Sequence, residues 1–144
     1  MIDDDPILSR TLRRALKPHE VQTASSASEA EILILDPNYQ PDLVVCDVFL
    51  PGANGNVLHE RVLGVRPEIA ARFVFVTGGA LGRAEADYIK QSGRPTLIKP
   101  VDLKTLFNLL EPSPEPDSTR TSVRTLSDGG TTDRATLGPP RKPA

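Results

Sequence analysis

The chain has 144 residues, of which 25% are charged, and a formal net charge of −2. Its single cysteine excludes an internal disulfide and any zinc site built from several cysteines. No apolar stretch is long enough to span a membrane, the N-terminus lacks a basic region followed by an apolar one, and no basic cluster indicates a nucleic-acid surface. We therefore expect a cytoplasmic protein that binds neither membranes nor nucleic acid.

The composition changes near the end of the first three quarters of the chain. Residues 1–110 alternate apolar runs with charged stretches. Residues 111–144 contain six prolines and ten serines or threonines, with only Val123, Leu126 and Leu137 as larger aliphatic residues. Such a segment cannot bury enough apolar surface to offset the entropy lost on ordering. We predict a folded domain at 1–110 and a disordered tail rich in Pro, Ser and Thr at 111–144.

Strands and helices are predicted to alternate along the folded part. The expected strands lie at 1–2, 20–24, 42–46, 72–76 and 96–98. The expected helices begin near residues 6, 26, 56, 81 and 102 and end near residues 17, 36, 65, 91 and 110. The central strands are continuously apolar, which is typical of strands covered by helices on both faces. Five such units predict a doubly wound α/β domain with a parallel sheet.

Residue types with known preferences mark several helix ends. Pro6 suits the first turn of the first helix, where its missing N–H needs no partner. Ser26 or Ser28 is expected to cap the second helix and Asp102 the last one. Gly93 is the stop signal of the fourth helix.

Polar side chains stand at the ends of four predicted strands. They are Asp3 and Asp4, Asp47, Thr77, and Lys99. Because the carboxyl ends of parallel strands meet at one edge of a sheet, we expect these side chains to converge although they are far apart in sequence. No single loop or helix could gather them. The edge of the sheet is therefore the predicted functional site.

The converging groups suit a cation and a phosphoryl group. Carboxylates in close contact repel one another unless a cation lies among them, and hard oxygen ligands with water favour Mg²⁺. Lys99 supplies a positive charge and Thr77 a hydroxyl donor, both suited to phosphoryl oxygens. Asp47, exposed before the Pro51-Gly52 turn, is the expected nucleophile for an aspartyl phosphate.

These residues resemble the receiver domain of the response regulators of two-component systems. The resemblance rests on Asp3-Asp4-Asp5-Pro6, Asp47-Val48-Phe49-Leu50-Pro51-Gly52, Thr77-Gly78-Gly79 and Lys99-Pro100. Each motif alone is weak, whereas four in the right order at predicted strand ends are specific. The segment 75–110 looks most like the C-terminal receivers of hybrid histidine kinases. The resemblance implies a five-stranded, flavodoxin-like sheet with strand order 2-1-3-4-5.

The resemblance also implies which residues accept the phosphoryl group and hold the metal. Asp47 would be the phosphoacceptor and would receive the phosphoryl group from the phosphohistidine of a histidine kinase. Asp4 would bind Mg²⁺ directly and Asp3 largely through water. Asp47 and the backbone carbonyl of Phe49 would complete the metal ligands.

Further residues are implied to bind and sense the phosphoryl group. Thr77 would turn toward it, Gly78 would leave room for the donor, and Lys99 would pair with it. The Lys99–Pro100 peptide bond would be cis. The chain would act as a signalling domain and would catalyse only its own phosphorylation and dephosphorylation.

Two kinds of protein partner are implied. The histidine kinase could be a separate protein or an upstream part of the same polypeptide. A downstream partner would bind the face made by the fourth helix (81–91), the fifth strand (96–98) and the fifth helix (102–110). No DNA-binding output segment is predicted in the chain.

Two features depart from the family pattern. Only Met1 and Ile2 precede Asp3, whereas strands usually need about five residues, so the central first strand is expected to be truncated. The position three residues before Lys99, where the family has an aromatic switch residue, is Thr96. These departures argue for an alternative, a scaffold that binds a partner without phosphorylation, whereas the complete set of acids, Thr77 and Lys99 argues against it.

The remaining candidates have simpler interpretations. A Mg²⁺-dependent phosphatase with an aspartate nucleophile would need a second acid two residues after Asp47, where Phe49 stands. Cys46 is expected to be a small core residue rather than a reactive thiol. His19 and His59 have no partners at metal-ligand spacing and are expected at the surface.

Overall fold

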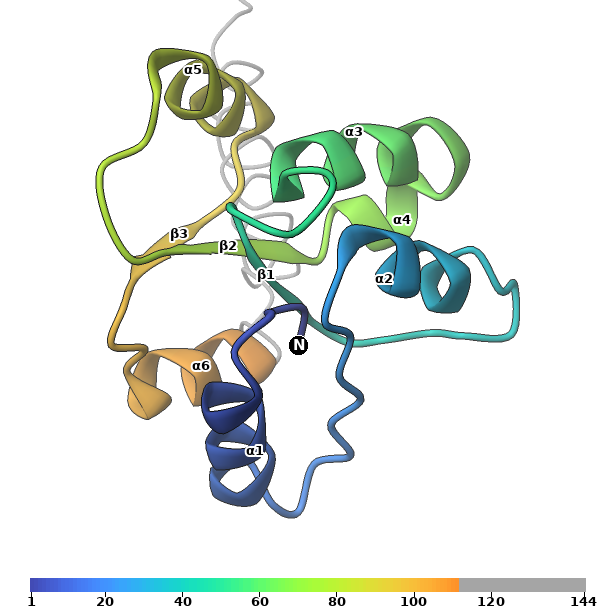
Figure 1. The fold of residues 1–144 in the computed structure, drawn as a ribbon. Helices are drawn as coiled ribbons and strands as arrows, with labels where there is room; N and C mark the ends of the chain where they lie inside the picture. Colours follow the sequence, from blue (N-terminus) through green and yellow to red (C-terminus); the bar gives the residue numbers. More distant parts are fainter. Residues whose placement is uncertain (112–144) are drawn as a thin grey trace, which may run out of the picture. The chain divides into compact units, whose positions relative to one another are not determined.

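Helices and strands alternate along residues 1–111, the part of the chain that the computed structural model describes (Figure 1). The helices are α1 (Pro6–Ala15), α2 (Ala27–Ile34), α3 (Gly55–Val65), α4 (Pro67–Ala70), α5 (Arg83–Ser92) and α6 (Leu103–Leu110). The strands are β1 (Val44–Asp47), β2 (Phe73–Thr77) and β3 (Thr96–Ile98). None of the described helices has the length and apolar character needed to cross a membrane. The predicted tail, apart from Glu111, lies outside the described residues, and its disorder stays a prediction.

The three strands form a parallel sheet in the order β1–β2–β3. Ile2 continues this sheet beyond β1, because it forms parallel bridges to Cys46 on one side and to Ala24 on the other. The segments across the sheet therefore lie in the order 20–24, 1–2, β1, β2, β3. This is the predicted order 2-1-3-4-5 of a flavodoxin-like fold, which the structure confirms.

The predicted strand 20–24 is shorter than expected, and this part of the prediction was wrong, whereas the first strand is short, as predicted. The N–H of Ile2 donates to the Val45 carbonyl at 2.7 Å, and the N–H of Asp3 donates to the Ala24 carbonyl at 3.0 Å. Of the predicted strand 20–24, only Ala24 forms a bridge, through Ile2. A strand needs a paired backbone along its length. The segment before Ala24 does not form a strand because its neighbour in the sheet pairs through a single residue.

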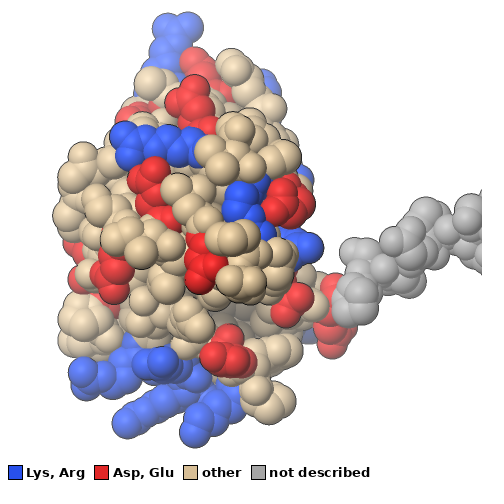
Figure 2. All heavy atoms as spheres, turned by 90° about the vertical axis from the view of Figure 1, so that its right-hand side faces the viewer, with Lys and Arg blue, Asp and Glu red and all other residues tan. Residues whose placement is uncertain are grey.

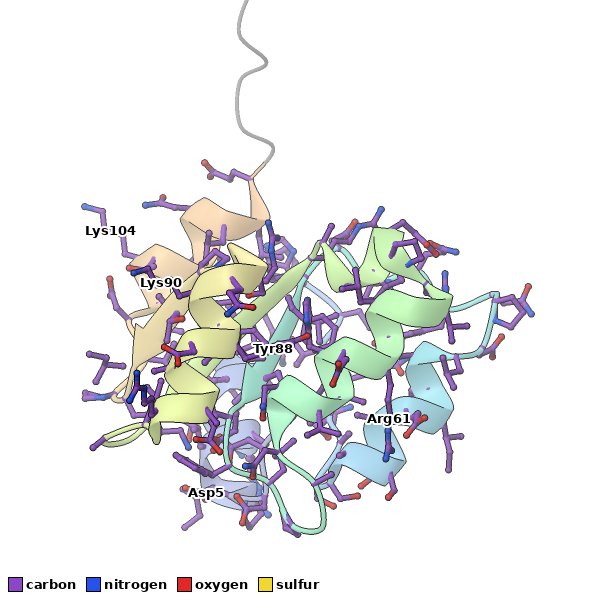
Figure 3. The ribbon with its side chains drawn as sticks, turned by 90° about the horizontal axis from the view of Figure 1, so that it is seen from above. Asp5, Arg61, Tyr88, Lys90 and Lys104 are labelled. Atoms are coloured by element: carbon purple, nitrogen blue, oxygen red, sulfur yellow. The ribbon has the colours of Figure 1, made fainter. Side chains whose placement is uncertain are left out.

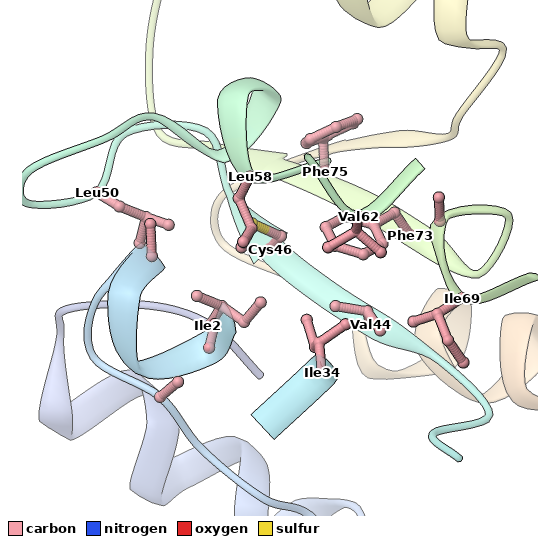
Figure 4. Close-up of a cluster of buried hydrophobic side chains, with 14 of the residues drawn as sticks. Ile2, Ile34, Val44, Cys46, Leu50, Leu58, Val62, Ile69, Phe73 and Phe75 are labelled. Atoms are coloured by element: carbon pink, nitrogen blue, oxygen red, sulfur yellow. The ribbon is translucent and has the colours of Figure 1, made fainter. Parts of the chain in front are cut away.

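Helices cover both faces of the sheet (Figure 1), with α1 and α6 on one face and α2, α3 and α5 on the other. Successive strand residues point to opposite faces, so Val44 lies in one apolar cluster and Val45 in another. The larger cluster, under α2, α3 and α5, is drawn in Figure 4 and includes Ile2, Ile34, Cys46, Leu58, Val62, Phe73 and Phe75. Cys46 is fully buried there, as predicted, and burial raises the pKa of its thiol. This arrangement confirms the doubly wound prediction.

Most of the predicted helix ends are confirmed. The Asp5 carboxylate accepts hydrogen bonds from the first turn of α1, the Ser26 hydroxyl accepts one from the first turn of α2, and the Asp102 carboxylate does the same for α6. Gly93 ends α5 with a φ of 69°, a left-handed conformation that glycine adopts without strain. The short helix α4 was not predicted, because four residues are too few to show a helical period.

His59 is buried, and its predicted surface position was wrong; His19 is exposed as expected. On α3 the buried residues Gly55, Leu58, His59 and Val62 follow the helical spacing of a core face. The Nε2 atom of His59 lies 3.1 Å from the Ala70 carbonyl oxygen, and Nδ1 lies 2.7 Å from the Tyr88 hydroxyl. The helical spacing could have predicted this burial. It could not have predicted the two hydrogen-bond partners that satisfy the buried ring nitrogens.

The hydrogen-bond partners of His59 fix its tautomer. A carbonyl oxygen only accepts, so Nε2 carries the proton and Nδ1 accepts from the hydroxyl of Tyr88. Burial lowers the pKa of His59, which keeps the ring neutral near pH 7. The ring also packs edge-on against Phe73 and Phe75.

Charged side chains of both signs are spread over the face shown in Figure 2, except at the end where α1 lies, where lysines and arginines gather. On α1 and the turn after it, Arg10, Arg13, Arg14 and Lys17 are exposed. This basic end was not predicted, because the positive and negative charges of the whole chain nearly cancel.

Candidate functional site

The polar residues predicted at strand ends meet at the carboxyl edge of the sheet. The register aligns Asp47 with Val76, and Thr77 with Ile98. The bridge between Ile2 and Cys46 carries the chain on to Asp3, next to Asp47. The backbone pairing alone therefore brings together residues from the start, the middle and the end of the domain.

The ammonium group of Lys99 lies between two buried carboxylates. Its Nζ atom is 2.8 Å from Oδ2 of Asp47 and 2.9 Å from Oδ2 of Asp3. Asp3 is only 2% exposed and Asp47 only 6% exposed, so neither carboxylate is well hydrated. Charges buried in this way are stable only when they are paired. The single positive charge of Lys99 is therefore shared by two carboxylates, and the three side chains together keep a net negative charge.

The pKa shifts at this contact favour a reactive carboxylate. Burial raises the pKa of Asp47, while the hydrogen bond from Lys99 and the N–H of Phe49 oppose the rise. Burial alone would lower the pKa of Lys99, but its close contacts with the carboxylates of Asp47 and Asp3 raise this pKa, so the amine stays protonated. A partly desolvated carboxylate that remains ionised is more nucleophilic than one in water.

The acidic groups are close enough together to bind one metal ion. Carboxylate oxygens of Asp3, Asp4 and Asp47 all lie within 4.8 Å of one another. Oδ2 of Asp3 is buried and, among the described residues, accepts no hydrogen bond of good geometry, although it forms the ion pair with Lys99. Three carboxylates against one amine leave an excess of negative charge and free oxygen lone pairs. These residues fit a hard divalent cation such as Mg²⁺.

Asp5 and Phe49 contribute in other ways. Asp5 is turned away from the cluster, because its Oδ1 accepts hydrogen bonds from Ile7 and Leu8 in the first turn of α1. The backbone N–H of Phe49 donates to Oδ1 of Asp47 at 3.0 Å. The structure thus places the backbone of Phe49 against the acceptor, while a metal contact from its carbonyl stays a prediction.

Thr77 and Gly78 line the far side of the site. The Thr77 hydroxyl is buried, donates to the Gly79 carbonyl at 3.0 Å and accepts from the Gly79 N–H at 3.3 Å. A methyl group at Gly78 would meet the Cδ atom of Lys99 at 3.5 Å, an ordinary contact. The Lys99–Pro100 peptide bond is cis. In this state the Thr77 hydroxyl is therefore engaged in its own turn rather than directed at Asp47.

Gly55 supports the backbone of the acceptor residue, a role that was not predicted from the sequence. Its N–H donates to the Val48 carbonyl at 2.7 Å. A Cβ at this position would collide with the carbonyl oxygen of Asp47 and lie 2.9 Å from Sγ of Cys46. The start of α3 therefore rests directly on the backbone of the acceptor residue, and only glycine leaves room for it.

We expect Gly55→Ala to shift the Asp47 loop and to destabilise the domain by about 1–3 kcal/mol, the usual cost of overpacking a core. Gly64→Ala is the matched control, because Gly64 lies in the same helix and a Cβ there meets nothing within 4 Å. That substitution should instead stabilise the domain by up to about 1 kcal/mol through helix propensity. Urea denaturation of both variants measures the difference, and equal effects would show that the close contact is not real.

Comparison with known proteins places this site in a family context. The family model described as the response regulator receiver domain matches residues 1–111. Among curated proteins, the photosynthetic apparatus regulatory protein RegA of Rhodobacter capsulatus is 32% identical over 111 residues, covering 76% of this chain and 59% of RegA. The DNA-binding transcriptional regulator NtrC of Azospirillum brasilense is 31% identical over 111 residues, covering 76% of this chain and 22% of NtrC. The matched part is thus less than two thirds of either relative.

Solved structures agree with the fold. The non-phosphorylated HemR receiver domain from Leptospira biflexa is 32% identical and has a TM-score of 0.64, covering 80% of this chain and 94% of that one. A CheY-like response regulator receiver domain protein from Methanospirillum hungatei is 25% identical with a TM-score of 0.63, covering 74% of this chain and 84% of that one.

Proposed function

The chain belongs to the response regulator receiver domain family, a family of signalling domains in two-component systems, and from this membership we propose that it accepts a phosphoryl group from a histidine kinase on Asp47. The observation that carries the proposal is the Lys99 ammonium held between Asp3 and Asp47 at the carboxyl edge of the sheet. A desolvated carboxylate next to a fixed positive charge suits the attack on a phosphoryl group and the binding of its oxygens.

Each residue of the site has a task in this transfer. An oxygen of Asp47 attacks phosphorus while the P–N bond of the donor breaks, and the donor imidazole, already protonated on its other ring nitrogen, leaves as neutral imidazole. Lys99 remains beside the new aspartyl phosphate and pairs with its oxygens. Thr77 gives up its contact with Gly79 and donates its hydroxyl to the same group. Gly78, exposed beside Lys99, leaves the approach open to the donor.

Asp3, Asp4, Asp47 and the carbonyl of Phe49 would hold the cation. When bound, Mg²⁺ would neutralise the charge on the phosphoryl oxygens. In the absence of the cation, Lys99 is the counter-ion of Asp3 and Asp47. Asp4 is exposed, so its carboxylate is the most accessible of the three to a cation in solution.

The output of the domain would be a change in protein binding. We propose the face of α5, β3 and α6 as the partner surface, where Ile98 is 73% exposed at the edge of the sheet. Arg10 and Arg13 of the basic end line the same pocket as Asp3 and Asp4, and we propose this surface for the histidine kinase, either a separate protein or part of the same polypeptide.

One observation favours a second candidate, a scaffold that binds its partner constitutively. Thr96 is exposed on β3 and is too small to act as an aromatic switch. A domain without such a switch could keep the receiver fold and its partner surface while phosphorylation changes nothing. The two candidates differ in whether partner affinity depends on Mg²⁺ and a phosphodonor.

The metal requirement tests the proposed site. We expect Asp4→Asn to weaken Mg²⁺ binding roughly tenfold or more, because a carboxylate ligand is lost. Asp5→Asn is the matched control: the adjacent Asp5 caps α1, a role that asparagine also fills, so Mg²⁺ affinity should change little. Calorimetric titration measures both affinities, together with Mg²⁺-dependent mass gain from a small phosphodonor. Equal losses in the two variants would contradict the assigned ligands.

A further inference from the structure

Helix α5 is attached to the rest of the domain by few contacts. Ile89 is its only residue that is fully buried, and its N-cap, Gly82, offers no side chain to the first turn. Two side-chain hydrogen bonds join it to α3: Tyr88 to His59 at 2.7 Å, and Glu85 to Asn54 at 3.3 Å. Figure 3 shows Tyr88 between the two helices. The position of α5 therefore depends strongly on these two contacts.

The α3 end of both contacts is tied to the phosphoacceptor. Asn54 is the N-cap of α3, a position where asparagine normally accepts a hydrogen bond from the first turn. Here its side chain makes no capping bond and instead donates to Oε1 of Glu85. The next residue, Gly55, rests against the Asp47 carbonyl. A movement of the Asp47 backbone must therefore move the residue that holds α5.

The His59 contact can exist in two distinct arrangements. Nε2 of His59 is fixed by the Ala70 carbonyl, so the ring cannot follow α5 if that helix moves. The Tyr88 hydroxyl, on a side chain that is only half-buried, can leave Nδ1 for water. Leaving Nδ1 unpaired inside the core is costly, so the contact is either made or broken rather than stretched.

We propose that α3 transmits the phosphorylation state of Asp47 to α5 through the pairs Asn54–Glu85 and His59–Tyr88. His59 and Tyr88 are positioning residues in this scheme, and they provide a route to the partner surface that needs no aromatic side chain at Thr96. The inference rests on the proposed function, because it assumes that Asp47 changes state.

Hydrogen–deuterium exchange of the α5 amides tests this route in the full chain, with and without beryllofluoride plus Mg²⁺ as the phosphoryl mimic. In the unsubstituted protein, the mimic should change the exchange rate of the α5 amides by at least about threefold. In Tyr88→Phe, exchange in α5 should be about tenfold faster without the mimic, because one tether is lost, and should no longer respond to it. The Tyr88→Phe variant should still bind the mimic, which ¹⁹F NMR measures.

Three further variants separate the loss of the tether from general destabilisation. Tyr39→Phe removes a hydroxyl that has no hydrogen-bond partner among the described residues, and should keep the full response. Glu85→Gln keeps an acceptor oxygen for Asn54 and should respond normally, whereas Glu85→Ala should not. A full response in Tyr88→Phe, or no response in the unsubstituted protein that binds the mimic, would overturn the inference. Failure of the unsubstituted protein to bind the mimic at all would instead reject the proposed function, and the inference with it.

Discussion

Asp47→Asn should abolish phosphorylation of the chain by a small phosphodonor in the presence of Mg²⁺. Asp47 is a buried carboxylate with Lys99 at 2.8 Å and with a pKa raised by burial, and an amide at the same position is not a nucleophile. The expected mass gain of one phosphoryl group in the unsubstituted protein should fall to background. Intact-mass spectrometry after short incubation measures this directly.

The control for this variant is Asp42→Asn, because Asp42 is an exposed acid that precedes the same strand. It should be phosphorylated like the unsubstituted protein. Incorporation that survives in Asp47→Asn would show that another residue is the acceptor, and the assignment of the site would be wrong. Because both variants remove one negative charge, a difference between them cannot come from net charge.

Adding an Ile-Val pair directly before Met1 should stabilise the domain by several kcal/mol. Ile2 lies in the cluster under α2, α3 and α5, and Met1 packs against the cluster under α1 and α6. Strand alternation then places the added valine on the first side and the added isoleucine on the second. A cavity of about 350 Å³ on the second side is lined by Leu12, Leu16, Val21, Leu106 and Leu110, together with polar residues such as Gln22 and Asp42. Each aliphatic side chain that becomes fully buried contributes roughly 1.5–3 kcal/mol.

The same extension should change how stability depends on pH. The Met1 amine donates to the Gln22 carbonyl at 2.9 Å, and burial lowers its pKa from 8.0 to about 6. In the unfolded chain this amine binds a proton below about pH 8, so the free energy of unfolding should fall as the pH drops from 8 to 6. An amide in place of the amine removes this slope.

Urea denaturation at several pH values measures both effects. A Ser-Gly extension of the same length is the control: it also removes the charged amine but adds no aliphatic side chain. It should flatten the pH dependence without the large gain in stability. If the Ile-Val and Ser-Gly extensions unfold at the same urea concentration, the added aliphatic side chains do not pack against the two clusters as expected.

The site could be predicted from sequence because its assembly depends on topology rather than on detailed packing. Asp47 and Lys99 each follow a short apolar run, and any parallel sheet brings such positions to one edge. The predicted doubly wound fold followed from the same alternation. Asp3 and Asp4 were predicted on the same argument even though their strand pairs through one residue.

Other residues could not be predicted because their roles depend on where helices lie in three dimensions. In the sequence, Gly55 next to Asn54 is typical of a turn. Only the position of α3 in the structure shows that Gly55 contacts the backbone of the acceptor Asp47. Arg66 would be assigned to the surface by its charge. In the structure it is 7% exposed, and its Nη1 donates to the carbonyls of Ile34, Asp36 and Tyr39. No local pattern in the sequence indicates such partners.

The single-residue pairing of Ile2 at the centre of the sheet has a consequence for how the acidic site assembles. Asp3 and Asp4 directly follow a bridge of one residue, and a segment held by so few backbone hydrogen bonds opens at a lower free-energy cost than the core. Local opening of this segment would separate both acids from Asp47 without unfolding the helices. A cation that binds only the closed form would shift this equilibrium toward the closed form, as any ligand of the native state does. In such a domain, the concentration of free divalent cation would set the fraction of molecules that are competent to be phosphorylated.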